Sequence, residues 1–136
     1  MGRARRLSAL RARFSPATPY LLVRARVEGP AGARLVQALL DTGATTTTIR
    51  PSVLSVLGVD TGAATEHFEI ASLSGIERPP VVTVTALTAL GVEVRGMRVL
   101  AFELPGQAQF DAILGLDFMR GHRLVLDFRE GVLEFD

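Results

Sequence analysis

The stretch LLDTGATTTTIR, residues 39–50, places a carboxylate between an apolar segment and a run of β-branched residues. Gly43 permits backbone angles that a side chain would forbid, so the chain can turn sharply beside Asp41. Two leucines precede the turn as the end of a predicted strand, and Thr45–Ile49 has the composition of the next strand. The pattern therefore predicts an aspartate held on a tight turn between two strands.

The tetrapeptide Asp-Thr-Gly-Ala occurs twice, at residues 41–44 and again at residues 60–63. The second copy follows Pro51–Leu57, a predicted short helix with proline at its first position and a glycine just beyond its end. Because Asp, Thr and Gly are common turn residues, we interpret the second copy as a turn after this helix. The alternative is a catalytic pair formed by Asp41 and Asp60 within one chain.

The rest of the chain alternates short apolar segments with glycine-containing turns, which is typical of an all-β protein. A second short helix is predicted at residues 116–121, and residues 92–94 and 97–102 are expected to pair around Gly96. Asp117 and Asp127 are interpreted as structural carboxylates, and Asp111 is expected to face solvent. Further strands are predicted at residues 20–28, 34–40, 65–71, 80–90, 110–114, 123–128 and 132–135.

The composition limits the chemistry that the chain can carry. Its 136 residues suit a single domain, and the absence of cysteine excludes disulfides, thiolate metal sites and cysteine nucleophiles. His67 and His122 lack the spacing of metal ligands, so neither a metal nor a cofactor is expected. The glycine-rich motifs that bind phosphate, GxGxxG and GxxxxGK[ST], do not occur.

All 15 basic residues are arginines, and five of them lie in the first 14 residues. We predict a flexible basic tail at residues 1–15, able to form a short helix, followed by a folded domain at residues 16–136. A basic tail suits nucleic acid, anionic lipid or an acidic partner, but we interpret it as a solvated leader and expect no nucleic-acid partner. No apolar run approaches the roughly 18 residues of a membrane helix. A cytoplasmic location is the default expectation, with membrane association only through a segment outside this sequence.

Three segments together resemble the retropepsin-like aspartic proteases, the group of retroviral proteases and their single-domain bacterial relatives. Ala38–Ala44 (ALLDTGA) is similar to their active-site stretch, and Ala112–Met119 (AILGLDFM) to their apolar-apolar-glycine and helix segment. Ile70–Ile76 (IASLSGI) lies where that family has its flap hairpin. The three segments occur in the order of the family, and the resemblance covers roughly residues 18–136. It implies a closed β-barrel-like domain with a flap hairpin and one or two short helices.

The resemblance also implies roles for individual residues. Asp41 would be the catalytic aspartate, Thr42 would bond to a partner chain, and Gly43 would allow close approach, with Ala44 completing the turn. The residues at the flap over the substrate would be Leu73, Ser74, Gly75 and Ile76. The residues that pack beneath the turn and border the pocket would be Ile113, Leu114 and Gly115.

The chain is too short for two lobes that each carry an aspartate turn, so the resemblance implies a two-fold homodimer with Asp41 from both copies. Two adjacent carboxyls share a proton and can hydrolyse a peptide bond of a polypeptide substrate by activating water. One alternative is a non-catalytic peptide-binding or dimerisation module on the same fold. Another is a phosphate-binding turn of the actin-like ATPase type, which is disfavoured because that fold needs two much larger lobes.

Overall fold

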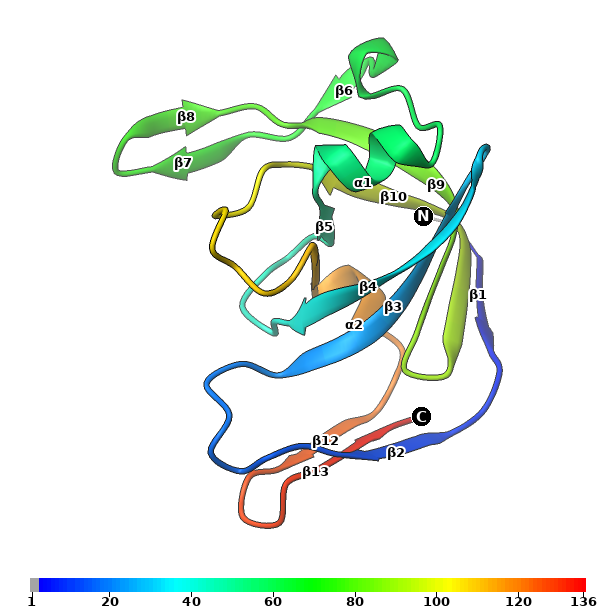
Figure 1. Ribbon diagram of the computed structural model, residues 1–136, viewed down its shortest axis with the longest axis vertical. Helices are drawn as coiled ribbons and strands as arrows, with labels where there is room; N and C mark the ends of the chain where they lie inside the picture. Colours follow the sequence, from blue (N-terminus) through cyan, green and yellow to red (C-terminus); the bar gives the residue numbers. More distant parts are fainter. Residues whose placement is uncertain (1–2) are drawn as a thin grey trace.

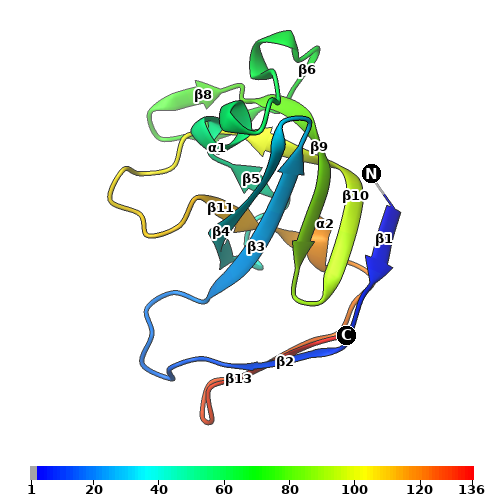
Figure 2. The same ribbon diagram turned by 45° about the vertical axis from the view of Figure 1, so that its right-hand side comes forward.

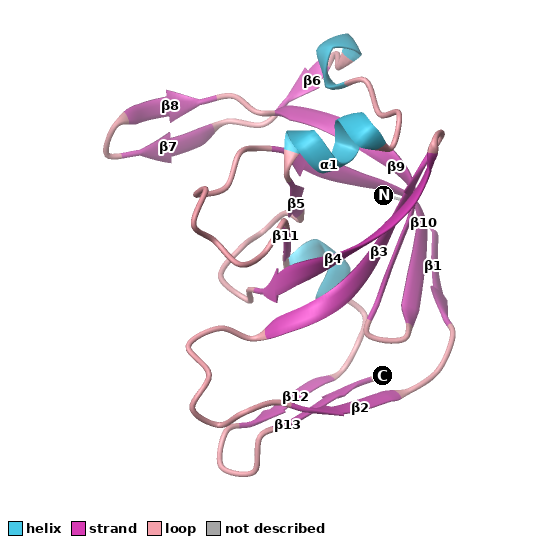
Figure 3. Ribbon diagram, in the orientation of Figure 1, coloured by secondary structure: helices cyan, strands magenta, loops and turns pink. Residues whose placement is uncertain are grey.

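The computed structural model describes residues 3–136, which form a mostly β structure with short helices (Figure 1). The elements are β1 (Arg3–Arg6), β2 (Leu10–Arg13), β3 (Leu22–Gly29), β4 (Gly32–Leu40), β5 (Thr48–Ile49), α1 (Pro51–Val56), the 3₁₀-helix η1 (Thr61–Ala63), β6 (Glu66–His67), β7 (Ile70–Ser72), β8 (Gly75–Glu77), β9 (Pro80–Ala89), β10 (Val92–Ala101), β11 (Ala112–Leu114), α2 (Leu116–Met119), β12 (Leu124–Asp127) and β13 (Val132–Phe135). Figure 3 shows how few of these residues are helical, as the all-β prediction required. No helix within residues 3–136 is long and apolar enough to cross a membrane.

Six strands close into a barrel in the order β10-β5-β11-β4-β3-β9, and β9 returns to pair with β10. The closed barrel confirms the predicted architecture. Two further strands extend the sheet, since β1 pairs with β10 and β6 pairs with β9. Large apolar side chains fill the interior and are almost completely buried there; they include Val27, Ile49, Val84, Leu87, Met97, Val99 and Leu114. Their burial supplies most of the stabilisation of the fold.

Strand β11 lies between β4 and β5, and this placement brings together two segments that are far apart in the sequence. Ala112–Leu114 runs parallel to Ala38–Leu40 and antiparallel to β5. The end of β4, where residues 39–50 begin, therefore lies beside the segment that leads into α2. Two of the three segments that carried the family resemblance, residues 38–44 and 112–119, meet at this point.

The hairpin expected at residues 70–76 is seen as strands β7 and β8, which span residues 70–77 and pair only with each other. Leu73 and Ser74 form its turn. The hairpin projects from the end of the barrel that carries β6 and lies opposite the sheet of β2, β12 and β13 (Figure 1, Figure 2). Leu73 is fully exposed at its tip.

The N-terminal residues differ from the prediction of a flexible or helical tail. Arg3–Arg6 pairs antiparallel with β10, and Leu10–Arg13 pairs antiparallel with β13 to complete a three-stranded sheet. The reason is alternation: within β2, Leu10 and Ala12 are half-buried while the two arginines are exposed. The helical expectation was therefore wrong, because the high charge hid a period-two pattern.

Strand β10 also differs from the prediction. The expected pair of strands around Gly96 is one strand that runs from Val92 to Ala101 in constant register with β9. Gly96 has a φ of 63°, so it interrupts the regular pairing locally without reversing the chain. Glycine inside a strand often marks such an irregularity rather than a turn.

Candidate active site

Asp41 follows the last residue of β4, and backbone contacts fix the turn that it begins. Its N–H donates to Leu114 O on the neighbouring strand at 3.0 Å. Its Oδ1 accepts from the N–H of Gly43 at 2.8 Å, and its carbonyl accepts from Ala44 N at 3.2 Å. The carboxyl is half-buried, whereas Thr42 and Gly43 are exposed. The turn thus holds one carboxylate oxygen in a defined orientation and presents its own tip to the outside.

Gly115 and the first residues of α2 support this turn. Leu116 N–H donates to Ala44 O at 2.8 Å, and Asp117 N–H donates to Thr45 O at 3.3 Å. A Cβ added at Gly115 would lie 2.8 Å from Ala44 O, so a side chain at this position would push the two backbones apart. Gly115 therefore lies in close contact with the backbone of the turn, where there is no room for a side chain.

Asp117 holds the turn from its other side. Both of its carboxylate oxygens lie 3.0 Å from the N–H of Thr47, and Oδ1 also accepts from the Thr47 hydroxyl at 2.7 Å. Thr47 is completely buried, and its hydroxyl oxygen accepts from Gly115 N–H at 3.1 Å. The sequence indicated a structural role for Asp117, but its partner lies 70 positions away and was not predicted.

A cavity of about 390 Å³ lies between the aspartate turn and the hairpin. Four turn residues line it from one side, and the strand that starts the hairpin lines it from the other. Its lining residues are Gly43, Ala44, Thr45, Thr46, Thr48, Phe68, Glu69, Ile70, Ala71 and Leu100. A second cavity of about 300 Å³ adjoins it and shares Thr46, Phe68 and Leu100. Sequence analysis missed Phe68 and Leu100, which carry no motif.

The remaining predicted residues lie near this cavity without lining it. At the hairpin, Leu73, Ser74, Gly75 and Ile76 are all exposed, and the tip extends beyond the cavity. On β11, Leu114 is buried and Ile113 is half-buried, and they pair with the last two residues of β4. Their position beneath the turn agrees with a supporting role.

The second tetrapeptide is the turn that the sequence predicted. Asp60 precedes η1, and its Oδ1 accepts from the N–H of Gly62 at 3.0 Å. Asp60 is exposed and lines a different cavity, which shares no residue with the cavity beside Asp41. The structure therefore gives no support to a pair of carboxyls formed by the two turns of one chain.

Arg50 is a buried residue that sequence analysis did not identify. Its guanidinium donates to the carbonyls of Leu104 and Pro105, each at 2.8 Å, and its Nε lies 3.0 Å from Asp111 Oδ1. The Oε1 atom of Glu103 lies 2.5 Å from Nη1 of Arg50. These bonds anchor both ends of the loop between β10 and β11, which lies on the same side of the molecule as the hairpin (Figure 1). Asp111 was expected to face solvent; its side chain is half-exposed and forms an ion pair with Arg50.

Residues 3–136 contain no group of three or more His, Asp or Glu side chains arranged to hold a metal ion. Asp41 itself does not line the cavity beside the turn, and the carboxylate among the lining residues is that of Glu69, which lies 3.5 Å from Arg78 Nε. The chemistry that the arrangement itself offers is that of an oriented aspartate at an open turn, next to a partly apolar cavity.

Comparison with known proteins agrees with this geometry. A family model described as aspartyl protease matches residues 23–118, a range that contains both the aspartate turn and the segment beneath it. Among solved structures, the fold is similar to that of a retropepsin-like aspartic protease from Rickettsia conorii, with 13% sequence identity and a TM-score of 0.70. That alignment covers 99% of this chain and 94% of the other. No curated protein matches the chain. The chain belongs to the aspartyl protease family and has the retropepsin-like fold.

Proposed function

We propose that the protein is an aspartic endopeptidase that works as a homodimer, with Asp41 from each copy forming the catalytic pair. The observation that carries the proposal is the half-buried carboxyl of Asp41, oriented by the Gly43 N–H on a turn whose tip is exposed. A single oriented carboxyl is a poor hydrolytic catalyst, whereas two that share a proton provide an acid and a base. Membership of the aspartyl protease family supports the same chemistry.

The second carboxyl is proposed to come from another copy of the chain. The other acidic residues near the turn are occupied, since Asp117 binds Thr47 and Glu69 faces Arg78. A two-fold axis beside the exposed tip of the turn would bring two copies of Asp41 together. Thr42 is exposed at that tip, and no bond of its side chain occurs within residues 3–136, so its hydroxyl is available for the partner chain.

In the proposed mechanism, one Asp41 accepts a proton from a bound water, which attacks the carbonyl carbon of the peptide bond. The other Asp41 donates its proton to the carbonyl oxygen and later assists the departure of the amine. General acid–base catalysis of this kind contributes about 10²- to 10⁴-fold to the rate. Substrate positioning between the turn and the β7–β8 hairpin would contribute further.

The proposed substrate is an extended polypeptide that binds along the cleft. Thr45 and Thr46 provide hydroxyl groups on one side of the cavity, and Phe68, Ile70 and Leu100 provide apolar surface. Apolar side chains near the scissile bond would fit this lining. The hairpin would act as the flap that covers the bound strand, in agreement with the exposed apolar tip at Leu73.

Mixing wild-type protein with the Asp41→Asn variant tests the two-chain site directly. The variant alone is expected to be folded and inactive toward a mixed peptide pool analysed by mass spectrometry. At equal concentrations, random exchange of subunits should lower the activity per wild-type chain to about half, because mixed dimers hold one carboxylate. Activity that is unaffected by the added variant, together with a monomeric mass in solution, would contradict the dimeric site. Turnover by Asp41→Asn alone would contradict the catalytic assignment.

A further inference from the structure

Strand β1 has a free edge, because it pairs with β10 and with no other strand of the described chain. Figure 2 shows it at the outer end of the sheet, beside β10. Leu7 N–H donates to Gly91 O at 2.8 Å, which extends the register of β1 and β10 by one residue. Backbone groups alternate between the two edges of a strand, so the N–H and C=O groups of Ala4 and Arg6 are directed to the free edge. An edge of this kind can accept another extended chain.

A groove of about 450 Å³ lies along this pair of strands, and arginines form most of it. Its lining residues are Arg3, Ala4, Arg5, Glu93 and Arg95. The register places Arg3 opposite Arg95. It also places Arg5 opposite Glu93, so these four side chains share one face of the sheet. That face is the outside of the barrel, because Val94 lies between the two β10 residues and its side chain is buried in the interior.

Glu93 lies beneath the arginines and holds two of them. Its side chain is 17% exposed, whereas those of Arg5 and Arg95 are 69% and 58% exposed. Its Oε1 lies 3.6 Å from Arg5 Nη2 and 3.7 Å from Arg95 Nη1, and Arg95 also lies 3.9 Å from Glu28. Arg3 is exposed and takes part in none of the ion pairs within residues 3–136. The groove therefore presents three guanidinium groups to solvent against one largely covered carboxylate.

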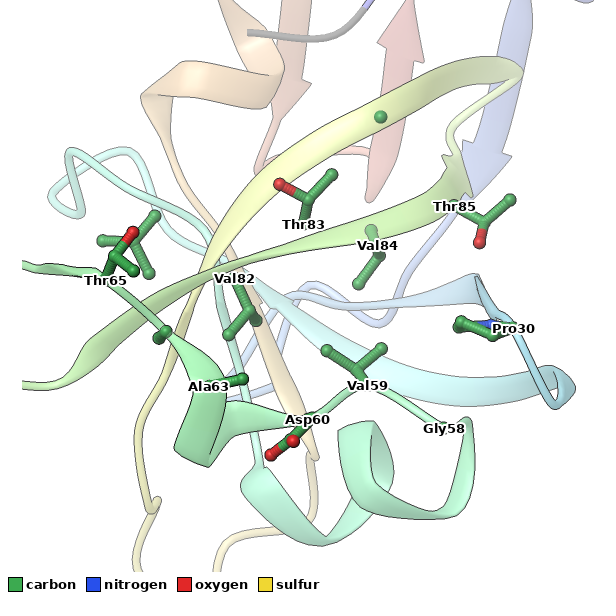
Figure 4. Close-up of a pocket in the computed structure, with 13 residues that line it drawn as sticks. Pro30, Gly58, Val59, Asp60, Ala63, Thr65, Val82, Thr83, Val84 and Thr85 are labelled. Atoms are coloured by element: carbon green, nitrogen blue, oxygen red, sulfur yellow. The ribbon is translucent and has the colours of Figure 1, made fainter.

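The cavity beside Asp60 differs from this groove in both respects. It has a volume of about 500 Å³ and lies between β9 and the connection from α1 to β6 (Figure 4). The 3₁₀-helix η1 lies against β9 there, so the edge of that strand is covered. Figure 4 shows the Asp60 carboxylate directed away from β9, and its Oδ1 already accepts from Gly62 N–H. The groove at β1 combines what that cavity lacks, a free strand edge and several charges of one sign.

We propose that the groove at β1 is a docking site for an acidic, extended segment of another polypeptide. The segment adds to β1 as a further strand and bonds to the outward backbone groups of Ala4 and Arg6. Arg3 and Arg5 lie two positions apart in a strand, so their side chains leave the same face about 7 Å apart. Aspartate or glutamate at every second position of the segment lies opposite them, and the guanidinium fork matches a carboxylate. The groove shares no lining residue with the cavity beside Asp41, and docking there does not depend on hydrolysis.

The charges of the groove argue against two other occupants. A second copy of the chain that paired with the free edge of β1 would place arginines opposite arginines, and like charges in that position are destabilising. Nucleic acid binds mainly through its phosphates. The carboxylates of Glu93 and Glu28 lie among the arginines of this face and weaken its attraction for a chain of phosphates. Backbone groups at a free edge, in contrast, bond specifically to another polypeptide.

Titration of two blocked pentapeptides into the full chain, followed through the NMR shifts of the protein amides, tests the proposal. One has the sequence valine-glutamate-valine-glutamate-valine, and the other has glutamine in place of both glutamates. The protein carries Asp41→Asn, so that neither peptide is hydrolysed. The glutamate peptide should bind at least about fivefold more tightly at an ionic strength of about 0.02 M, and about 0.5 M salt should remove most of this difference. The amides of Ala4 and Arg6 should shift and become protected from hydrogen exchange.

Two double variants with the same change in net charge locate the binding. Arg3→Gln combined with Arg5→Gln should lower the affinity of the glutamate peptide to that of the glutamine peptide. Arg11→Gln combined with Arg13→Gln is the matched control on β2, where both arginines are exposed. Each pair contains one arginine near a glutamate, Arg11 being 3.8 Å from Glu134, and one that forms no ion pair within residues 3–136. The control should keep the parent affinity within about twofold. The comparison of the two peptides on the parent protein remains valid if a variant fails to fold.

Four outcomes would overturn the proposal. The first is equal binding, or no binding, of the two peptides. The second is an equal loss of affinity in both double variants, which would mean that overall charge attracts the peptide. The third is tighter binding of a short oligothymidylate than of the glutamate peptide, which would assign the groove to nucleic acid. The fourth is protection of the Ala4 and Arg6 amides that rises with protein concentration without any peptide, which would show that a second copy of the chain occupies the edge.

Discussion

The two Asp-Thr-Gly-Ala turns share a sequence and a local hydrogen bond but differ in everything that surrounds them. In each, the aspartate Oδ1 accepts from the N–H of the glycine two residues later, at 2.8 Å for Asp41 and 3.0 Å for Asp60. This is the bond that an aspartate at the start of a turn makes in many proteins. The tetrapeptide therefore encodes the turn, and the rest of the chain decides whether the turn becomes a site.

The difference lies in what supports each turn. The first is bonded to β11 through Asp41 N–H and lies on the glycine and helix segment that begins at Gly115. The second lies on the exposed connection between α1 and β6, where η1 is its only regular structure. Support from two distant segments holds the Asp41 carboxyl half-buried at the cleft, whereas Asp60 remains an exposed carboxylate. Preorganisation of this kind is what catalysis requires.

Removing the two carboxyls separately is the strongest test of the comparison. Asp41→Asn should lower the rate of peptide cleavage by about 10²- to 10⁴-fold or more, because the acid and base functions depend on it. Asp60→Asn should leave the rate within about twofold, because its cavity shares no residue with the cleft. Initial rates on one peptide substrate, with circular dichroism to confirm folding, provide the measurement. An equal loss in both variants would mean that the two turns act together.

The support of the first turn by Thr47 should have the next largest effect. Thr47→Val removes the hydroxyl's bond to Asp117 while keeping the backbone N–H bond, and it leaves the buried N–H of Gly115 without its acceptor. We expect the free energy of unfolding in urea to fall by about 2 to 3 kcal/mol. Thr48→Val is the matched control, because Thr48 is also buried and forms no side-chain hydrogen bond within residues 3–136. Its expected change is within about 0.5 kcal/mol. Similar losses in both variants would remove the special role of Thr47.

Close approach beneath the first turn gives a third prediction. Gly115→Ala adds a Cβ that meets Ala44 O at 2.8 Å, so the turn must shift. The expected loss is about 1 to 3 kcal/mol of unfolding free energy, with a lower cleavage rate. Gly106→Ala is the control, because nothing lies within 4 Å of the added atom. A Gly115→Ala variant as stable and as active as Gly106→Ala would show that the contact is not needed.

Sequence alone predicted the elements that have a strong periodic pattern, together with the two segments that meet at the turn. The strands around residues 20–28 and 80–90 follow from alternation of apolar and polar residues. The β7–β8 hairpin came from its turn residues and the family resemblance, because its strands are largely exposed and show no alternation. The meeting of residues 38–44 with residues 112–119 came from the family resemblance, because no local signal specifies which strands become neighbours. The structure places β11 between β4 and β5 and supplies that information.

The contacts that sequence could not predict join residues without a shared motif. Arg50 binds the backbone carbonyls of Leu104 and Pro105, and any residue type carries a carbonyl. Arginine is usually exposed, so its burial here had no sequence signal. Strand β2 was missed for the opposite reason, since its exposed arginines alternate with the half-buried Leu10 and Ala12. The high arginine content of residues 3–13 suggested a solvated tail, although residues 10–13 carry the period-two pattern of a strand.

The smallest expected effect concerns the cap of the second turn. Asp60→Ala removes the bond to Gly62 N–H at an exposed 3₁₀-helix of three residues. We expect a loss of about 0.5 to 1 kcal/mol in the free energy of unfolding, the usual value of an exposed cap. Asp60→Ser keeps an acceptor for the N–H and should recover most of this loss. Urea titration of the two variants provides the measurement. A loss as large as that of Thr47→Val would mean that the second turn is held by more than its own hydrogen bond. The two turns would then differ in their effect on peptide cleavage and no longer in how strongly the fold supports them.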